Sequence, residues 1–175
     1  MSAIDNLTRE QLLVLCKNFA KNWLAHDGLW FQAVERSQNL EHAIELDAEA
    51  WSRFSPIEAK RIKQFLGLPE NGGLEALQEA LDYRLYAVLN KQRSELLAGK
   101  LRFYMDDCRV QSARKRKGLP DFPCKPVGLA EYETFAHAID SRISTRCITC
   151  PPDEHPKEYY CAWEFWIDET KGQDR

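Results

Sequence analysis

The sequence predicts an α+β fold: about five N-terminal helices, then a small antiparallel sheet with a covering helix and a cysteine-rich loop region. Apolar residues recur every three to four positions through the first hundred residues, as on one face of a helix. After Gly99 the apolar period becomes two, which is typical of half-buried strands. We expect a single domain over residues 1–175, with a helical part over 1–99, a cysteine-rich α+β part over 100–168 and a polar tail over 169–175.

Local start and stop signals divide the first part of the chain into helices. Thr8 and Gln11 have the spacing of a capping box, and glycines end several of the periodic runs. Ser55-Pro56-Ile57-Glu58 reads as a further start, because serine caps well, proline suits the first turn and glutamate suits the third. The expected helical segments are 9–28, 29–36, 39–54, 56–66 and 74–99.

Alternation and proline content organise the second part. Leu101, Phe103 and Met105 alternate with polar residues, and Tyr159 to Asp168 is the clearest alternating run. Three prolines between Leu119 and Gly128 predict a loop. The expected elements are strands at 101–106, 142–149 and 159–168, a short helix at 112–117 and a longer helix at 129–140.

Composition limits the classes of partner. The formal net charge is -3 over 175 residues. This balance gives no electrostatic reason to expect nucleic acid or an anionic membrane. No apolar run is long enough to span a bilayer, and residues 1–10 lack the features of a signal peptide. We therefore expect a cytoplasmic protein with an unidentified small molecule as its partner, and we leave a homodimer open.

The cysteines are unevenly distributed. Five of the six fall in the last third of the chain, and in a reducing cytosol cysteines indicate metal binding, catalysis or core packing rather than disulfides. Cys147 and Cys150 form a CxxC pair followed by two prolines, a spacing that lets two sulfurs face one point. Cys124 also lies between prolines. Thiolates of this kind favour zinc.

We predict a zinc site formed by Cys108, Cys124, Cys147 and Cys150. Cys161 and His155 are reserve ligands, although Cys161 also fits a small buried apolar residue of the last strand. An iron–sulfur cluster is the alternative cofactor. The third interpretation is a nucleophilic cysteine with a histidine, either His137 or His155, as its base.

Three further side chains are candidate ligand-binding residues. Arg109 and Arg114 could hold a carboxylate, because guanidinium groups bind carboxylates with two parallel hydrogen bonds. Trp30, in the run His26 to Phe31, could line a pocket. The run Arg114 to Lys117 is also explained by a solvated helix face.

Several stretches resemble a known family. Asp27 to Phe31, Cys108 to Gln111, and Cys147 to Asp153 followed by Cys161 to Phe165 look like an uncharacterised prokaryotic family of cytosolic proteins. Residues 101–167 are more distantly similar to the 4-vinyl reductase domain and to L-2-amino-thiazoline-4-carboxylate hydrolase. The first likeness implies a small-molecule-binding module in which cysteine-bound zinc occurs, and the second implies a hydrolase.

Three functional hypotheses follow. The first is a zinc-binding small-molecule-binding or sensing module, with the metal in a structural role. The second is a cysteine-dependent hydrolase with Cys108 or Cys147 as nucleophile, and the third is an iron–sulfur electron-transfer protein. The sequence leaves open whether the protein is an enzyme, and it assigns no catalytic residue.

Overall fold

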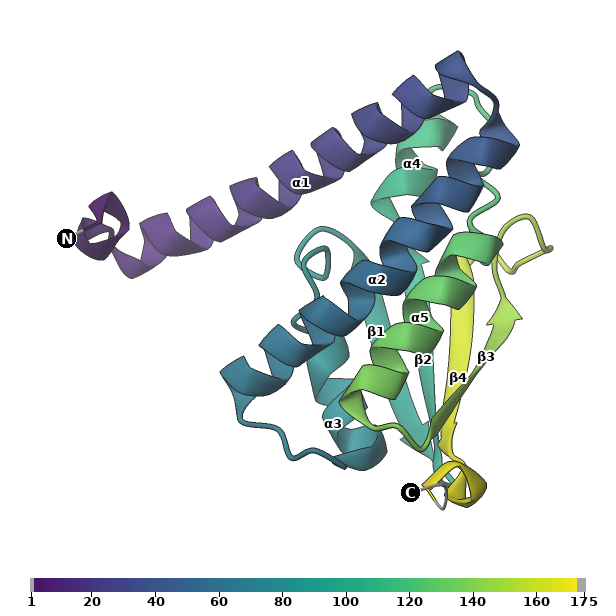
Figure 1. Ribbon diagram of the computed structural model, residues 1–175. Helices are drawn as coiled ribbons and strands as arrows, with labels where there is room; N and C mark the ends of the chain where they lie inside the picture. The colour runs from purple at the N-terminus through teal and green to yellow at the C-terminus, as the bar shows by residue number, and fades with distance from the viewer. Residues whose placement is uncertain (1, 173–175) are drawn as a thin grey trace.

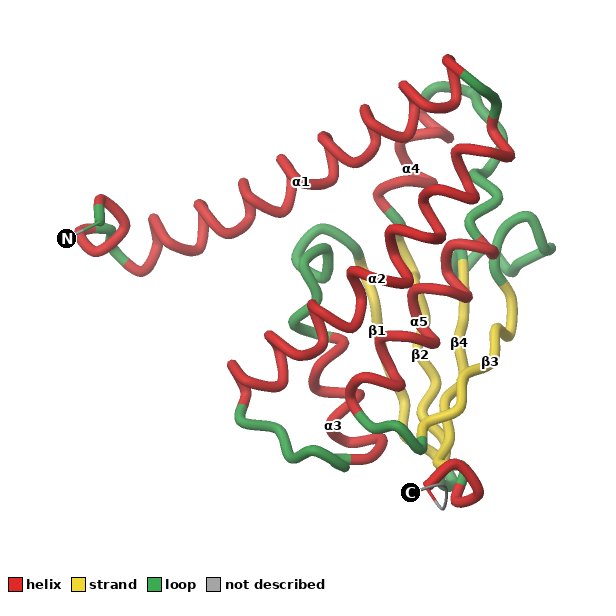
Figure 2. The backbone as a smooth tube through the Cα atoms, in the orientation of Figure 1, coloured by secondary structure: helices red, strands yellow, loops and turns green. Residues whose placement is uncertain are grey.

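The computed structural model describes residues 2–172. Its helices cover one face of a four-stranded antiparallel sheet, and a long N-terminal helix extends beyond the rest of the molecule (Figures 1 and 2). The predicted α+β class is confirmed. A short 3-10 turn, Ala3–Asn6, precedes the first long helix, and another, Glu169–Gly172, begins the predicted polar tail. Residues 173–175 of that tail lie outside the described part of the chain.

Two long helices replace the four short segments expected before residue 67. α1 spans Arg9–Ser37, with the predicted capping box formed at Thr8 and Gln11, and α2 spans Leu40–Leu66. Gly28 does not end α1, and Pro56 lies inside α2. These two predicted boundaries are wrong. One face of α2 is buried against α5. This burial stabilises a continuous helix through Ser55 and Pro56, where the local sequence resembles a helix start.

The long helix predicted from 74 to 99 is also wrong. α3 spans only Gly73–Leu81, a series of turns follows, and strand β1 spans Lys91–Leu97. β1 turns back into β2, Lys100–Asp107, through Ala98 and Gly99, which both have positive φ. Such a two-residue turn joins antiparallel strands closely. The long-range pairing of β1 with β2 therefore outweighed the helical period of the local sequence.

The remaining elements follow the predicted order. They are α4 at Arg109–Arg116, α5 at Lys125–Ile139, β3 at Ile143–Thr149 and β4 at Cys161–Ile167. The sheet has the order β1-β2-β4-β3, so the cysteine-bearing β4 is a central strand. The proline-rich loop is shorter than expected, because α5 begins four residues before the predicted start.

The core lies between the sheet and the helices α2, α3 and α5. Trp163 of β4 is fully buried and stacks on Tyr132 of α5, with ring centroids 4.6 Å apart. Gly128 permits this approach, because a Cβ there would lie 2.7 Å from the Trp163 ring. Within residues 2–172, none of the helices has both the length and the apolar character needed to cross a bilayer.

Candidate functional site

A buried arginine organises a polar cluster beneath the helices. Arg84, in the turns after α3, donates from Nε and Nη2 to Oε2 of Glu58 on α2, at 3.0 and 2.9 Å. Its Nη1 donates to Oε1 of Glu131 on α5, at 2.5 Å, and to the hydroxyl of Tyr86, at 2.6 Å. The Tyr86 hydroxyl in turn donates to Glu131. Arg84 is thereby fixed by three separate parts of the chain.

Aromatic rings surround the Arg84 guanidinium. Its Cζ lies 4.7 Å from the ring centroid of Tyr86 and 4.5 Å from that of Phe135. Trp51 and Tyr132 lie slightly farther away, each with its centroid 5.6 Å from Cζ. Cations interact favourably with aromatic faces, especially away from water. Burial raises the pKa of Tyr86 and of Tyr132 well above the usual range, so both hydroxyls stay protonated.

Two further carboxyl groups approach this cluster from outside. Asp27 lies on α1, and Asp47 on α2 hydrogen-bonds with Trp51. Burial, followed by the negative charge of Glu131, raises the pKa of Asp27 to about 6. Burial and the charges of Asp27 and Glu131 raise the pKa of Asp47 to about 7. Arg84 neutralises Glu58 and Glu131. Asp27 and Asp47 form no ion pair among the described residues, although His26 lies near Asp27 and lowers its pKa less than burial and Glu131 raise it.

The same face of α2 carries an unused polar atom. Asp47, Trp51, Ser55 and Glu58 succeed one another at helical spacing on α2. Ser55 is fully buried, and its Oγ has no hydrogen-bond partner in the described part of the chain. Buried polar atoms are normally hydrogen-bonded. The Ser55 hydroxyl could therefore form a hydrogen bond with a bound molecule. We refer to Asp27, Asp47, Trp51, Ser55, Glu58, Arg84, Tyr86, Glu131 and Tyr132 together as the Arg84 cluster.

The cysteines of the last third form a second cluster. Sγ of Cys124 lies 3.6 Å from Sγ of Cys150. Cys150 also contacts the sulfur atoms of Cys147 and Cys161, and these sulfur contacts, more than burial, raise its pKa. Cys108 lies near Cys124 and Cys161 but is largely desolvated, which raises its pKa to about 12. The structure thus brings together all five of these cysteines, which come from four parts of the chain.

Two contacts of Lys125 hold the cysteine loops together. The Lys125 amide donates to the carbonyl oxygen of Pro151 at 2.9 Å. Its Nζ donates to Asp153 at 2.7 Å. The hydrogen bond to Cys150, and then the positive charge of Lys125, lower the pKa of Cys147 below its usual range. Cys147 therefore becomes a thiolate more readily than an ordinary cysteine.

The sulfur spacing can be compared with that of a zinc site. Zinc–sulfur bonds of about 2.3 Å in a tetrahedron place the sulfurs roughly 3.8 Å apart. The 3.6 Å between Cys124 and Cys150 is close to that spacing. In the described part of the chain, however, no three or more His, Cys, Asp and Glu side chains are arranged as a group that could hold a metal ion. Metal coordination would therefore require the thiols to rotate about their side-chain bonds.

The predicted histidine partners lie elsewhere. His155 bonds through Nδ1 with the carbonyl oxygen of Pro156 and through Nε2 with Asp121, at 2.9 and 3.1 Å. His137 is exposed on α5. Between residues 2 and 172 no hydrogen bond joins a histidine to a sulfur. The arrangement of a cysteine with an adjacent base is not formed here.

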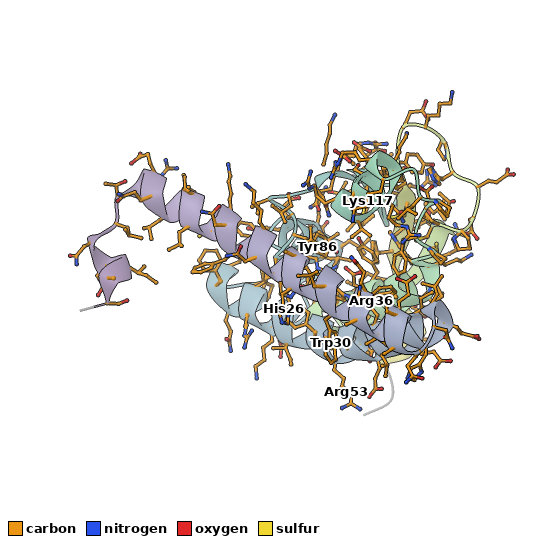
Figure 3. The ribbon with its side chains drawn as sticks, turned by 90° about the horizontal axis from the view of Figure 1, so that it is seen from above. His26, Trp30, Arg36, Arg53, Tyr86 and Lys117 are labelled. Carbon is orange, nitrogen blue, oxygen red and sulfur yellow. The ribbon has the colours of Figure 1, made fainter. Side chains whose placement is uncertain are left out.

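The predicted ligand-binding residues lie on two helices, α1 and α4. Trp30 is 66% exposed on α1, on the side of that helix away from Tyr86 (Figure 3). Arg109 is exposed on α4, and Arg114 donates from Nε to the carbonyl oxygen of Pro120 at 2.8 Å. A role for these three residues in ligand binding stays a prediction.

Sequence reasoning missed the Arg84 cluster. The sequence places Glu58 at a helix start and Arg84 inside a helix, whereas α3 ends at Leu81, before Arg84. One signal was available, since Glu131 directly precedes Tyr132 and lies one turn before Phe135 on the apolar face of α5. A charged residue on an otherwise apolar helical face indicates a buried partner.

The family model that matches covers residues 5–167. The chain belongs to the family of unknown function DUF6125. This confirms the predicted membership of an uncharacterised family but assigns no activity. No curated protein matches the chain. The likenesses to the 4-vinyl reductase domain and to the hydrolase gain no support from these comparisons and stay predictions.

A solved structure shares the fold of this DUF6125 member. It is the crystal structure of the phenol-responsive sensory domain of the transcription activator PoxR with phenol. The TM-score is 0.54 at 15% sequence identity, over 82% of this chain and 73% of the sensory domain. At this identity the likeness shows a common fold.

Proposed function

We propose that this DUF6125 member is a cytoplasmic small-molecule-sensing module whose ligand binds at the Arg84 cluster. The main observation in support is that the Arg84 side chain is fully buried and forms ion pairs with Glu58 and Glu131, with aromatic rings around it. Removing such charges from water is costly, and an apolar core of similar volume is often at least as stable. A buried cluster with charge and unused bonding capacity is therefore better explained by ligand binding than by stability.

The chemistry of the cluster selects a kind of ligand. Asp27 and Asp47 form no ion pair in the described structure, although His26 lies near Asp27, and the Ser55 hydroxyl has no hydrogen-bond partner there. The rings of Trp51 and Tyr86 offer apolar walls. These groups suit an aromatic or apolar molecule that carries a hydrogen-bond donor or a positive charge, and they disfavour an anion. The PoxR sensory domain, which binds the donor phenol, supports this choice through its common fold.

A matched panel of single-ring compounds tests the proposal. Phenol and benzylamine each carry a hydrogen-bond donor, and benzoate carries a negative charge. We expect phenol and benzylamine to raise the melting temperature at millimolar concentration, and benzoate to have no effect. An equal or larger shift with benzoate would contradict the proposal, as would no shift with either donor.

Two variants of α2 locate the binding. Asp47→Asn removes a carboxylate of the cluster. We expect it to raise the dissociation constant of benzylamine about ten- to hundredfold, because a hydrogen bond to a charged group contributes about 1.5–3 kcal/mol. Glu49→Gln is the control, since Glu49 lies on the exposed face of the same helix. Equal effects of the two substitutions would place the ligand outside the cluster.

We further propose a structural zinc ion at the second cluster. The contacts of Cys150 favour Cys124, Cys147, Cys150 and Cys161 as its ligands, so Cys161 replaces Cys108 in the predicted set. Four thiolates close the coordination sphere and leave no water to activate, which supports a structural role. The hydrolase is less well supported, because burial holds the Cys108 thiol protonated and no histidine bonds a described sulfur. The comparisons offer nothing for an iron–sulfur protein.

A further inference from the structure

The first half of α1 presents an apolar face that nothing in the described structure covers. Figure 1 shows this half of the helix extending away from the sheet and from α2. Phe19 is 57% exposed, and Ala20 is the only buried residue among the 29 of α1. An exposed helix of this length is marginally stable by itself in water. The arm therefore needs a partner surface.

The apolar side chains form one stripe. Leu12, Leu15, Cys16 and Phe19 recur at positions i, i+3, i+4 and i+7. The charged residues Glu10, Lys17 and Lys21 lie on the opposite side of the helix by the same periodicity. A partner surface must therefore be apolar and uncharged along this stripe, which we call the α1 stripe.

The order of residues in the stripe suits a second copy. Counted outward from the midpoint between Leu15 and Cys16, the stripe is symmetric: Leu15 lies opposite Cys16 and Leu12 lies opposite Phe19 of an antiparallel copy. An antiparallel copy of the helix therefore brings these four apolar positions onto apolar positions. Twofold symmetric dimers require this kind of self-complementary surface.

We propose that the α1 stripe is the interface of a homodimer, in which the α1 helices of two copies pack antiparallel with their twofold axis near Cys16. The second half of each α1 carries Asp27 of the Arg84 cluster. A single continuous helix thus joins the partner copy to that cluster. The interface stands on the exposed stripe and does not depend on the proposed ligand.

Light scattering with size exclusion tests the interface on the full chain. We expect a mass of twice 20.3 kDa for the natural sequence and the monomer mass for Phe19→Lys. Val14→Lys is the matched control, because Val14 is 58% exposed on the opposite side of the same helix and should leave the dimer intact. Circular dichroism of each variant checks that α1 has formed. A monomer at submillimolar concentration, or dissociation by Val14→Lys but not by Phe19→Lys, would overturn the proposal.

Oxidative crosslinking tests the position of the axis. Copper phenanthroline should oxidise the two Cys16 thiols across the axis to a disulfide, giving a linked dimer on a non-reducing gel. Cys16→Ser should remove this product. A linked dimer that persists in Cys16→Ser would place another cysteine at the contact and contradict the axis. A monomer that cosediments with phosphatidylcholine–phosphatidylglycerol vesicles would instead assign the stripe to a lipid surface.

Discussion

Arg84 and Glu131 form an ion pair at 2.5 Å between a turn segment and the middle of α5, and Arg84 has no solvent-exposed side-chain surface. Glu58 completes the pairing from α2. One arginine therefore connects α2 and α5 with the turns after α3. Its charge is also the only buried positive charge near four carboxyl groups, namely Asp27, Asp47, Glu58 and Glu131 in the described structure.

Removing the Arg84 charge should strongly destabilise the fold. Arg84→Met keeps most of the volume but leaves Glu58 and Glu131 buried without a cation, so we expect a loss of about 3–5 kcal/mol in the free energy of unfolding measured in urea. Arg53→Met is the control. The Arg53–Glu49 pair is solvent-exposed, and its loss should cost no more than about 0.5 kcal/mol. An equal loss in the free energy of unfolding for both substitutions would contradict the burial of the Arg84 ion pairs.

The raised pKa values of Asp27 and Asp47 predict a pH dependence of stability. The pKa of each is near 3.8 when unfolded and about 6 or 7 when folded. The folded state therefore holds protons that the unfolded state releases, and this contribution is full below about pH 4 and lost as the pH rises towards 7. Asp140 and Glu164 have lowered pKa values and act in the opposite direction at low pH.

A variant separates the Asp47 contribution from the others. Asp47→Asn resembles the protonated side chain at every pH. Its free energy of unfolding relative to the natural sequence should rise by on the order of 2 kcal/mol between about pH 4 and pH 7.5. Denaturant titrations across this range give the difference, with Glu49→Gln as the control that should stay constant. A pH-independent difference for Asp47→Asn would mean that Asp47 has an ordinary pKa.

Two glycine substitutions should have opposite signs. A Cβ at Gly128 would meet the Trp163 ring at 2.7 Å, so Gly128→Ala should destabilise by about 1–3 kcal/mol through overpacking. No atom lies within 4 Å of a Cβ at Gly28 in α1, and Gly28→Ala should stabilise by about 0.5–1 kcal/mol because alanine favours helix. Thermal unfolding of both variants checks the signs. Destabilisation by Gly28→Ala would indicate that a helix surface packs against α1 at that position.

The proposed zinc site predicts a specific pattern of metal loss. Elemental analysis should find one zinc per chain in the natural protein and in Cys108→Ser and Cys16→Ser. It should find little or none in Cys150→Ser and Cys161→Ser, and chelation should lower the melting temperature of the natural protein. Zinc-free natural protein of unchanged stability would contradict the site. Loss of zinc from Cys108→Ser but not from Cys161→Ser would restore the ligand set predicted from sequence.

The sequence was informative where local and long-range preferences agree. The alternation of Leu101, Phe103 and Met105 predicted β2, and Tyr159 to Asp168 predicted β4, because each strand has one face in the core. The CxxC pair and its prolines indicated that distant cysteines converge, and the contact between Cys124 and Cys150 confirms that convergence.

Prediction failed where tertiary packing decided the outcome. Pro56 does not interrupt α2, since the helix gains more from burial against α5 than it loses at one missing hydrogen bond. β1 has a poor strand pattern and forms because β2 offers an edge. The Arg84 cluster joins residues from α1, α2, the turns after α3 and α5, so no local pattern contains it.

Binding at the Arg84 cluster is tested most directly by amide chemical shifts during a titration with phenol. We expect the largest changes at Asp27, Asp47, Ser55, Arg84 and Glu131, and small changes on the outer face of the sheet. A shallow open hollow lies at Ser112, Lys115, Arg116 and Tyr160. Changes confined to that hollow, or none at the cluster, would contradict the proposed function.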